Sequence, residues 1–509
     1  MPTAISNNRR ILKNTFYLYI RMFLIMAVTL YTSRKVLQVL GVEDFGIYNV
    51  VGGIVAMMGI LNGAMASSMQ RYFSFELGEQ NDEKLHKIFC ISMTIYMLLC
   101  VVFVILAETI GVWFLNTQLM IPEEKMTAAN WVFQFSILAV IAKLLSNPYH
   151  AMIIAHEKMN VFAYISIAEV FINLSVVFLL LLTSYNKLII YSALLFLSAC
   201  VITTINRKYC ISHYEECKFK FIKDISLFKE LLSYSGWNLF GSIANIVKGQ
   251  GLNVLLGMFF TPAVNAARGI AYQVNAAVTQ FFSNFYTAVR PQITKYYAEG
   301  DMNNMFKLVF QSSKYSYYLI LLISLPLIIE TPFFINLWLG QIPENVIPFT
   351  RLIILITAID AMANPLMTTA HATGKIALYQ SLVGTTIIFN IPISYILLSL
   401  NFPPTSVFVV SLCISTFCLF LRLWIVNRLV AFPVWDYVKS VLLRSLVVSC
   451  CAAIAPILCA CMLDNSLASD IIVSFSCIIS SAAFIVAIGM DKQERNSCKS
   501  LITSKLGKR

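Results

Sequence analysis

Charged residues are scarce in this chain. They make up 12% of its 509 residues, whereas hydrophobic residues make up 59% and the mean hydropathy is +0.76. Soluble domains carry about 25% charged residues, because a surface that faces water needs them. The composition therefore excludes a string of soluble domains and places most of the chain in lipid.

Motifs for catalysis and metal binding are also missing. The thirteen cysteines form no C-x-x-C pair, and most lie inside apolar stretches, where cysteine packs as a small hydrophobic side chain. No G-x-x-x-x-G-K-[ST], H-E-x-x-H or G-x-S-x-G sequence occurs. We therefore expect no catalytic residues, no metal site, no cofactor and no enzyme activity. The net charge of +12 comes without a zinc-finger or RNA-binding motif, so we expect no nucleic-acid partner.

Long apolar stretches dominate what is present. A helix needs about 20 apolar residues to cross a bilayer, and about fourteen stretches meet this length. The fold class that they predict is an all-α polytopic membrane protein. The predicted spans are residues 11–32, 46–68, 88–107, 131–154, 161–183, 187–206, 237–259, 268–289, 315–336, 347–370, 376–399, 405–426, 441–463 and 468–489.

The basic residues indicate on which side each loop lies, since cytoplasmic loops carry an excess of Lys and Arg. With the N-terminus in the cytoplasm, most of the 37 basic residues fall on the cytoplasmic side. The opposite side holds only Arg34, Lys35, Lys125, Lys187 and Arg268. This partition predicts that both termini are cytoplasmic.

An internal repeat divides the chain. Asn147-Pro148 recurs as Asn364-Pro365, and two further polar residues recur at the same offset. Both halves start on the same side, so we predict two six-helix lobes in a parallel repeat, as many transporters have, plus two C-terminal helices. The expected parts are an N-terminal lobe at 1–206, a cytoplasmic linker at 207–236, a C-terminal lobe at 237–428, a two-helix hairpin at 429–490 and a basic cytoplasmic tail at 491–509.

The segment 33–48, SRKVLQVLGVEDFGIY, resembles the first loop of Wzx-type polysaccharide flippases. In that family the pattern R-x-L-G-x-x-x-[FY]-G-[IL]-[YF] recurs, with variable spacing after the arginine. The resemblance extends in length and helix plan over nearly the whole chain. It implies the superfamily that also holds multidrug exporters, in which two lobes form a V around a central cavity and work by alternating access.

The resemblance also implies a cargo and a location. The Wzx branch moves undecaprenyl-pyrophosphate-linked oligosaccharide, such as an O-antigen or capsule repeat unit, from the cytoplasmic to the periplasmic leaflet of the bacterial inner membrane. A polysaccharide polymerase and glycosyltransferases are the expected protein partners, and a monomer is the expected state. H⁺ or Na⁺ is a candidate coupling ion.

Two other functions remain open at this stage. An ion-coupled multidrug exporter of the same superfamily usually has twelve helices and an acidic cavity. A membrane polymerase, ligase or acyltransferase normally carries a sizeable periplasmic loop, and the loops here are short. Both features favour the flippase.

Cations inside the predicted spans indicate a binding site, because a charge at the bilayer centre costs about 2.5–3.5 kcal/mol on insertion scales. We predict that these cations bind a pyrophosphate, for which Lys and Arg supply charge and donors. The alternative is that they form ion pairs that close the bundle, or reach the interface. The predicted cations are Arg21, Lys143, Lys248 and Arg351 inside the spans and Arg34, which we expect, with Arg268, at the periplasmic mouth.

Polar side chains recur at three- and four-residue steps on two adjacent spans and predict a wall that faces sugar. The alternative is helix packing through interhelical hydrogen bonds. These side chains are Asn238 and Asn245 on the seventh span and Gln273, Gln280 and Asn284 on the eighth. Predicted hinges are Pro148, Pro365, Gly249 and Gly251, because proline removes a backbone donor and glycine bends easily.

Two carboxylates inside the spans, Asp360 and Glu169, are the candidates for ion coupling. A carboxylate in a low-dielectric site exchanges a proton closer to neutral pH than one in water. Lys143 next to either acid would instead make that pair structural.

Overall fold

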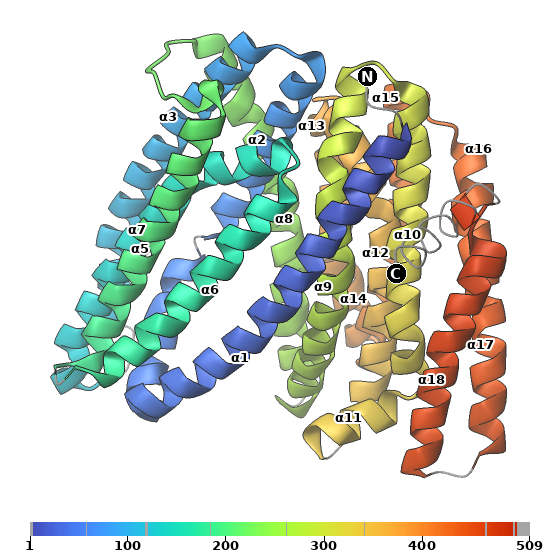
Figure 1. The fold of residues 1–509 in the computed structure, drawn as a ribbon. Coiled ribbons are helices and arrows are strands. Elements are labelled where there is room, and N and C mark those ends of the chain that lie inside the picture. The colour runs from blue at the N-terminus through green and yellow to red at the C-terminus, as the bar shows by residue number, and fades with distance from the viewer. Residues whose placement is uncertain are drawn as a thin grey trace, which may run out of the picture. The chain divides into compact units, whose positions relative to one another are not determined.

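The computed structural model describes residues 4–57, 59–117, 121–183, 185–260, 262–340, 342–463, 466–491 and 494–495. All regular elements in these ranges are helical (Figure 1). The chain divides into two compact units, which we call unit 1 and unit 2. Unit 1 comprises residues 1–242 and 288–301, and unit 2 comprises residues 243–287 and 302–509.

Unit 1 is built from the first seven α-helices, six of which are long, together with the start of the eighth and the end of the ninth. α5 packs along α7, α1 along α6, and α2 against α5. The helices are α1 (Ala4–Met57), α2 (Gly59–Glu79), α3 (Asp82–Leu106), the π-helical η1 (Ala107–Gly111), α4 (Val112–Thr117), α5 (Glu123–Ala155), α6 (Met159–Leu181), α7 (Lys187–His213), the 3-10 turn η2 (Glu215–Cys217), α8 (Ile225–Phe259) and α9 (Pro262–Ala298).

Unit 2 holds the remaining parts of α8 and α9 together with the helices that follow. α12 packs against α10 and α15, and α17 against α18, which also contacts α10. These helices are α10 (Met302–Ile329), α11 (Thr331–Leu339), α12 (Val346–Ala372), α13 (Ile376–Ile388), α14 (Asn390–Ser399), α15 (Ser406–Val430), α16 (Val434–Tyr437), η3 (Val438–Leu443), α17 (Arg444–Met462), α18 (Leu467–Phe484) and η4 (Ile485–Gly489).

Ten helices in the described residues are long and apolar enough to cross a membrane, and each matches one of the fourteen predicted spans. The chain is therefore an all-α multi-pass membrane protein. The other four predicted spans lie on α1, α2, α8 and α9. Because α8 and α9 carry many of the chain's polar and glycine residues, their membrane crossing stays a prediction from the charge partition.

The predicted first loop is helical. α1 continues through residues 33–45 and is interrupted at Gly41, where φ is +82° and ψ is 169°. Only glycine adopts this backbone region readily, because it has no Cβ. The expectation of an open loop between the first two predicted spans was therefore wrong: the motif lies on two helical segments that meet at this glycine.

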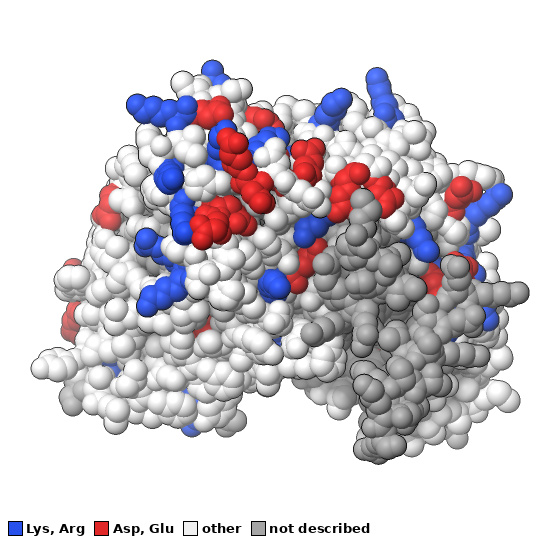
Figure 2. Space-filling model, turned by 45° about the horizontal axis from the view of Figure 1, so that its top comes forward, with Lys and Arg blue, Asp and Glu red and all other residues white. Residues whose placement is uncertain are grey.

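The surface of the helices fits a lipid environment. Many large apolar side chains are exposed, among them Leu182 at the end of α6 and Met462 at the end of α17, which are more than four-fifths accessible. On the face that Figure 2 shows, Lys, Arg, Asp and Glu gather toward one end, and the surface below them is almost uncharged. A soluble protein seldom exposes so much contiguous apolar surface, whereas a bilayer covers it.

Candidate functional site

A cluster of three charged residues lies inside unit 1. Lys143 on α5 approaches Glu169 on α6, with Nζ 3.8 Å from Oε1. Arg21 on α1 interacts electrostatically with the same carboxylate. We call these three residues the unit 1 cluster. It holds two cations and one anion.

Arg21 is held by an aromatic ring as well as by charge. Its guanidinium carbon lies 4.4 Å from the centre of the Phe162 ring. Its Nε is buried and has no hydrogen-bond partner in the described part of the chain. A buried guanidinium donor is normally satisfied. The unit 1 cluster therefore keeps donor capacity for an oxygen ligand.

A second cluster of the same composition lies inside unit 2. Arg422 on α15 has Nη1 3.9 Å from Asp360 Oδ1 on α12, and its Nε donates to the Tyr379 hydroxyl at 3.0 Å. Lys248 on α8 interacts electrostatically with both Asp360 and Arg422. We call Lys248, Asp360 and Arg422 the unit 2 cluster.

Arg422 was not predicted as a site residue, because the charge partition counts it on the cytoplasmic side, at the end of the predicted span 405–426. α15 runs on to Val430, so Arg422 lies two turns inside the helix. Its side chain is only 13% exposed, against 43% for Asp360. The sequence feature that could have placed Arg422 inside the span is the apolar run Leu423–Val426, which follows it.

Neither carboxylate that we considered for ion coupling stands alone. Glu169 lies beside Lys143, which is the arrangement that favours a structural pair. Asp360 on α12 lies beside Arg422 on α15. Each acid therefore has a cation close by, at 3.8 Å from Glu169 and at 3.9 Å from Asp360.

The predicted polar wall splits into buried and exposed members. Asn238 is buried and donates from Nδ2 to Ser68 Oγ at 2.7 Å, which joins α8 to α2 within unit 1. Asn284 is also buried and donates to the Gln280 carbonyl at 2.9 Å. Asn238 thus makes the interhelical hydrogen bond that the alternative interpretation expects, whereas the bond of Asn284 stays within α9. Asn245, Gln273 and Gln280 are exposed.

Arg268 makes contacts that its predicted place at the periplasmic mouth does not suggest. From α9 it donates to the Gly249 carbonyl at 2.6 Å and to Asn253 Oδ1 at 3.1 Å, both on α8. Its guanidinium also lies 4.3 Å from the Tyr272 ring. This arginine therefore fixes α8 at one of the predicted hinge glycines.

The hinge glycines differ in their surroundings. A Cβ at Gly249 would meet nothing within 4 Å, whereas a Cβ at Gly251 would lie 2.5 Å from Ile391 Cδ1 on α14. Gly251 thus permits close helix packing in unit 2. Pro148 and Pro365 both lie inside continuous helices, α5 and α12. Bending at the four positions stays a prediction.

Arg351, another predicted cation, lies outside both clusters. Arg351 on α12 donates from Nε to Thr331 Oγ1 and from Nη2 to the Ile329 carbonyl, both at 3.2 Å. These bonds tie the start of α12 to the junction between α10 and α11. Arg34 lies on α1, and its side chain is outside the described part of the structure.

Contacts of Tyr214 and Glu216 with His156 and His86, which we call the latch, join the segment between α7 and α8 to the rest of unit 1. His156 Nε2 lies 2.8 Å from Glu216 Oε1, and the His156 ring stacks on Tyr214. His86 Nδ1 contacts the Glu216 carbonyl oxygen at 2.9 Å. Burial acts to raise the pKa of the Glu216 carboxyl, but the hydrogen bond from His156 and the charges of both histidines outweigh it and hold this pKa below its ordinary value.

Comparisons with known proteins place these sites in context. A family model described as "Polysaccharide biosynthesis protein" matches residues 11–297. Among curated proteins, none matches the sequence significantly.

Solved structures share the fold at low identity. An outward-facing multidrug resistance MATE family transporter of the MOP superfamily has a TM-score of 0.72 and 12% identity, with 84% of this chain and 97% of that chain covered. A MOP superfamily transporter from Pyrococcus furiosus has a TM-score of 0.68 and 12% identity, covering 82% and 96%. The MATE transporter ClbM in complex with Rb⁺ has a TM-score of 0.66 and 15% identity, covering 85% and 98%. At these identities the likeness shows the fold alone.

Proposed function

Because the chain belongs to the polysaccharide biosynthesis protein family, we propose that it is a flippase for undecaprenyl-pyrophosphate-linked oligosaccharide. In this proposal the cargo is an O-antigen or capsule repeat unit. It moves from the cytoplasmic to the periplasmic leaflet of the bacterial inner membrane by alternating access of two lobes. The proposal goes beyond the membrane transporter that family and fold establish, since it names the cargo and the direction.

The charge balance of the two clusters carries the proposal. Each cluster sets two cations against one carboxylate, so each has a net charge of one positive unit when all three groups are ionised. An uncompensated cation inside a membrane is costly and is retained where an anion pairs with it. A lipid pyrophosphate supplies concentrated negative charge and oxygen acceptors for such groups.

The polar residues support a sugar moiety on the same cargo. Asn245, Gln273 and Gln280 are exposed amides on α8 and α9. Amides both donate and accept hydrogen bonds, so they suit the hydroxyl groups of a neutral glycan. We propose that these three residues contact sugar, while the clusters contact pyrophosphate.

A multidrug exporter is the competing function. One solved structure with the same fold is a multidrug resistance transporter, and another is described as having a binding pocket of reverse polarity. The fold is therefore compatible with cargoes of either sign. The cationic excess of both clusters favours an anionic cargo over the cationic drugs that acidic cavities accept.

Deletion of the gene tests the cargo. If the proposal holds, lipid-linked oligosaccharide accumulates in the cytoplasmic leaflet and the surface polysaccharide disappears, and expression of the wild-type protein restores both. Unchanged surface polysaccharide together with sensitivity to cationic drugs would favour the exporter instead.

The source of energy is a separate proposal. We infer that Asp360 and Glu169 serve mainly to offset part of the charge of their neighbouring cations until an anionic cargo arrives, because each carboxylate lies within 4 Å of a cation. Coupling to H⁺ or Na⁺ through either acid is tested by transport in vesicles with an imposed gradient. Asp360→Asn and Glu169→Gln that still respond to the gradient as the wild type does would exclude both acids as coupling sites.

A further inference from the structure

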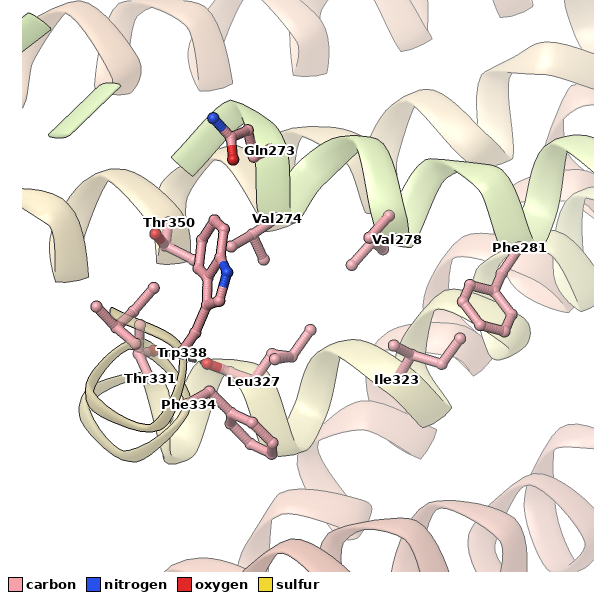
Figure 3. A pocket seen from close by; sticks show the side chains of 12 residues that line it. Gln273, Val274, Val278, Phe281, Ile323, Leu327, Thr331, Phe334, Trp338 and Thr350 are labelled. Atoms are coloured by element: carbon pink, nitrogen blue, oxygen red, sulfur yellow. Dashed lines mark hydrogen bonds between the residues drawn. The ribbon is translucent and has the colours of Figure 1, made fainter. Parts of the chain in front are cut away.

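A cavity of about 410 Å³ lies within unit 2, apart from its charge cluster. Side chains of α9, α10, α11 and α12 form its walls (Figure 3). Most of them are apolar, including Phe281 on α9, Ile323 and Leu327 on α10, and Trp338 on α11. Its volume falls within the range of about 300–1,000 Å³ that is usual for sites of small organic ligands.

The cavity has an apolar end and a polar end. Figure 3 shows Phe281 and Ile323 at one end, and Thr331 and Thr350 at the other, with the Trp338 indole beside the two threonines. α10 ends and α12 begins near the polar end, so it lies toward the predicted periplasmic surface. A ligand with a long apolar part and one polar end would match this gradient.

An unsatisfied hydroxyl at the polar end indicates a missing partner. Thr350 is 1% exposed, and its Oγ1 has no hydrogen-bond partner in the described residues. Threonine inside a helix commonly donates to the carbonyl four residues earlier, and buried hydroxyls rarely stay unpaired. An oxygen of a bound ligand would satisfy this group.

The cation Arg351 is hydrogen-bonded to a residue at the polar end of the cavity. Arg351 donates from Nε to the hydroxyl of Thr331, which lines the cavity. A guanidinium carries five N–H donors, and the two hydrogen bonds to Thr331 and Ile329 use two of them. The remaining donors suit a phosphate oxygen, for which arginine is well adapted.

We propose that this cavity binds one acyl chain of an anionic glycerophospholipid. The chain lies along Phe281 and Ile323, and the phosphate and ester oxygens lie near Arg351 and Thr350. A sugar does not suit walls that are mainly apolar, and a polyprenyl carrier is several times longer than an acyl chain and would fit only in part. Gln273 lines this cavity and also belongs to the proposed sugar wall, so the cavity adjoins the proposed cargo site, but neither charge cluster contributes to it.

Two adjacent alanines on α9 provide a matched pair of variants. Both alanines are exposed, but only Ala277 lines the cavity. Ala277→Phe fills the cavity, and Ala276→Phe adds the same bulk beside it. Ala277→Leu is a milder filling variant for the case that Ala277→Phe does not fold, and size-exclusion chromatography checks all three.

Fluorescence of Trp338 reports occupancy. All other tryptophans are replaced by Phe, and the purified protein in detergent is titrated with phosphatidylglycerol that carries bromine on its acyl chains. We expect saturable quenching in the parent and in Ala276→Phe, and at least tenfold weaker binding in Ala277→Phe. Arg351→Gln should weaken binding of this anionic lipid while leaving brominated phosphatidylcholine unchanged.

Competition between unlabelled lipids shows which kind of lipid supplies the acyl chain in the cavity. Unlabelled phosphatidylglycerol should displace the brominated lipid, whereas undecaprenyl phosphate at the same concentration should not. Displacement by undecaprenyl phosphate alone would overturn the proposal in favour of the carrier lipid. Linear, unsaturable quenching that is equal in all variants would overturn it entirely, because Trp338 would then contact only bulk lipid.

Discussion

Arg422 distinguishes a cargo site from a purely structural ion pair in unit 2. Its guanidinium is mostly buried between Asp360 and the Tyr379 hydroxyl, whereas Arg428 on the same helix is exposed near Trp424. If the unit 2 cluster binds an anionic cargo, removal of its buried cation weakens that binding. Removal of the exposed cation does not.

We predict that Arg422→Ala lowers glycan export about tenfold or more, which corresponds to the loss of one charge-assisted hydrogen bond of about 1.5–3 kcal/mol. Arg422→Lys keeps the charge and should retain more export, and Arg428→Ala should match the wild type. Surface polysaccharide per unit of membrane protein measures the effect. Normal export by Arg422→Ala at normal protein levels would remove the cluster from the cargo path.

Glu216 gives a prediction about pH. Its pKa is held below its ordinary value of 4.5 in the folded protein by His156 and His86, so the ionised carboxylate stabilises the fold. A lowered folded-state pKa means that this stabilisation is present above the unfolded-state pKa. It is lost as the pH falls below about 4.5 toward the folded-state pKa.

We therefore expect Glu216→Gln to lower the unfolding temperature in detergent at pH 6 and to flatten its dependence on pH between 6 and 3. The neighbouring Glu215→Gln is the control, since Glu215 is 88% exposed against 13% for Glu216. Equal curves for the two variants would show that the latch does not stabilise unit 1.

At the scale of elements, a buried ion pair joins the end of α9 to the end of α5 within unit 1. Lys295 Nζ lies 2.9 Å from Glu157 Oε1, and the two side chains are 15% and 1% exposed. Removal of one partner of a buried ion pair costs about 3–5 kcal/mol, because the remaining charge loses its compensating ion.

We predict that Lys295→Met destabilises the protein by about that amount, and that the double variant Lys295→Met, Glu157→Leu recovers part of the loss. Thermal unfolding in detergent measures both. A single variant as stable as the wild type would mean that solvent or lipid headgroups compensate Glu157.

The glycines of α8 separate bending from packing. Gly251→Ala places a Cβ against Ile391 and should cost about 1–3 kcal/mol of stability, as overpacking does. Gly249→Ala meets open space and should gain about 0.5–1 kcal/mol, because alanine is the better helix former.

Transport then decides whether Gly249 is a hinge. If α8 must bend there, Gly249→Ala lowers export although the protein is more stable. If both stability and export rise or stay the same, the hinge is not at this residue, and Arg268 merely anchors a rigid helix.

The sequence predicts the positions of the helices better than it predicts which charged side chains pair between helices. Hydropathy locates ten spans because each apolar run is a local property. The partners of the intramembrane charges depend on which helices are neighbours, and this is not local. Lys143 beside Glu169 was one of the considered arrangements, but Arg422 beside Asp360 was missed, because the charge partition assigned Arg422 to the cytoplasmic side although it lies within the span 405–426.

The polar wall shows the same limit. Asn238 and Asn245 share one helix face in the sequence pattern, yet Asn238 is buried against Ser68 while Asn245 is exposed. Spacing on a helix gives the face but not what covers it. Arg268 was likewise assigned to the periplasmic mouth, because nothing in the sequence indicates a bond to a backbone carbonyl on another helix.

At the scale of the whole molecule, the orientation follows from the basic residues and can be measured. We predict that cysteines introduced at Glu215 and Trp435 react only from the cytoplasm, and those at Tyr185 and Met462 only from outside. All four side chains are well exposed, and the chain's own cysteines are replaced beforehand. Reaction of either pair from the wrong side in intact cells would contradict the count of fourteen spans.

Movement of the cargo across a membrane shows directly whether the protein is a flippase for lipid-linked oligosaccharide. Purified protein is reconstituted into liposomes with lipid-linked oligosaccharide extracted from the deletion strain, and a membrane-impermeant glycosidase reports which leaflet holds the glycan. We predict that wild-type protein makes the glycan of the inner leaflet accessible and that Arg422→Ala does so about tenfold more slowly. Wild-type vesicles that leave this glycan protected, yet transport a cationic drug, would contradict it.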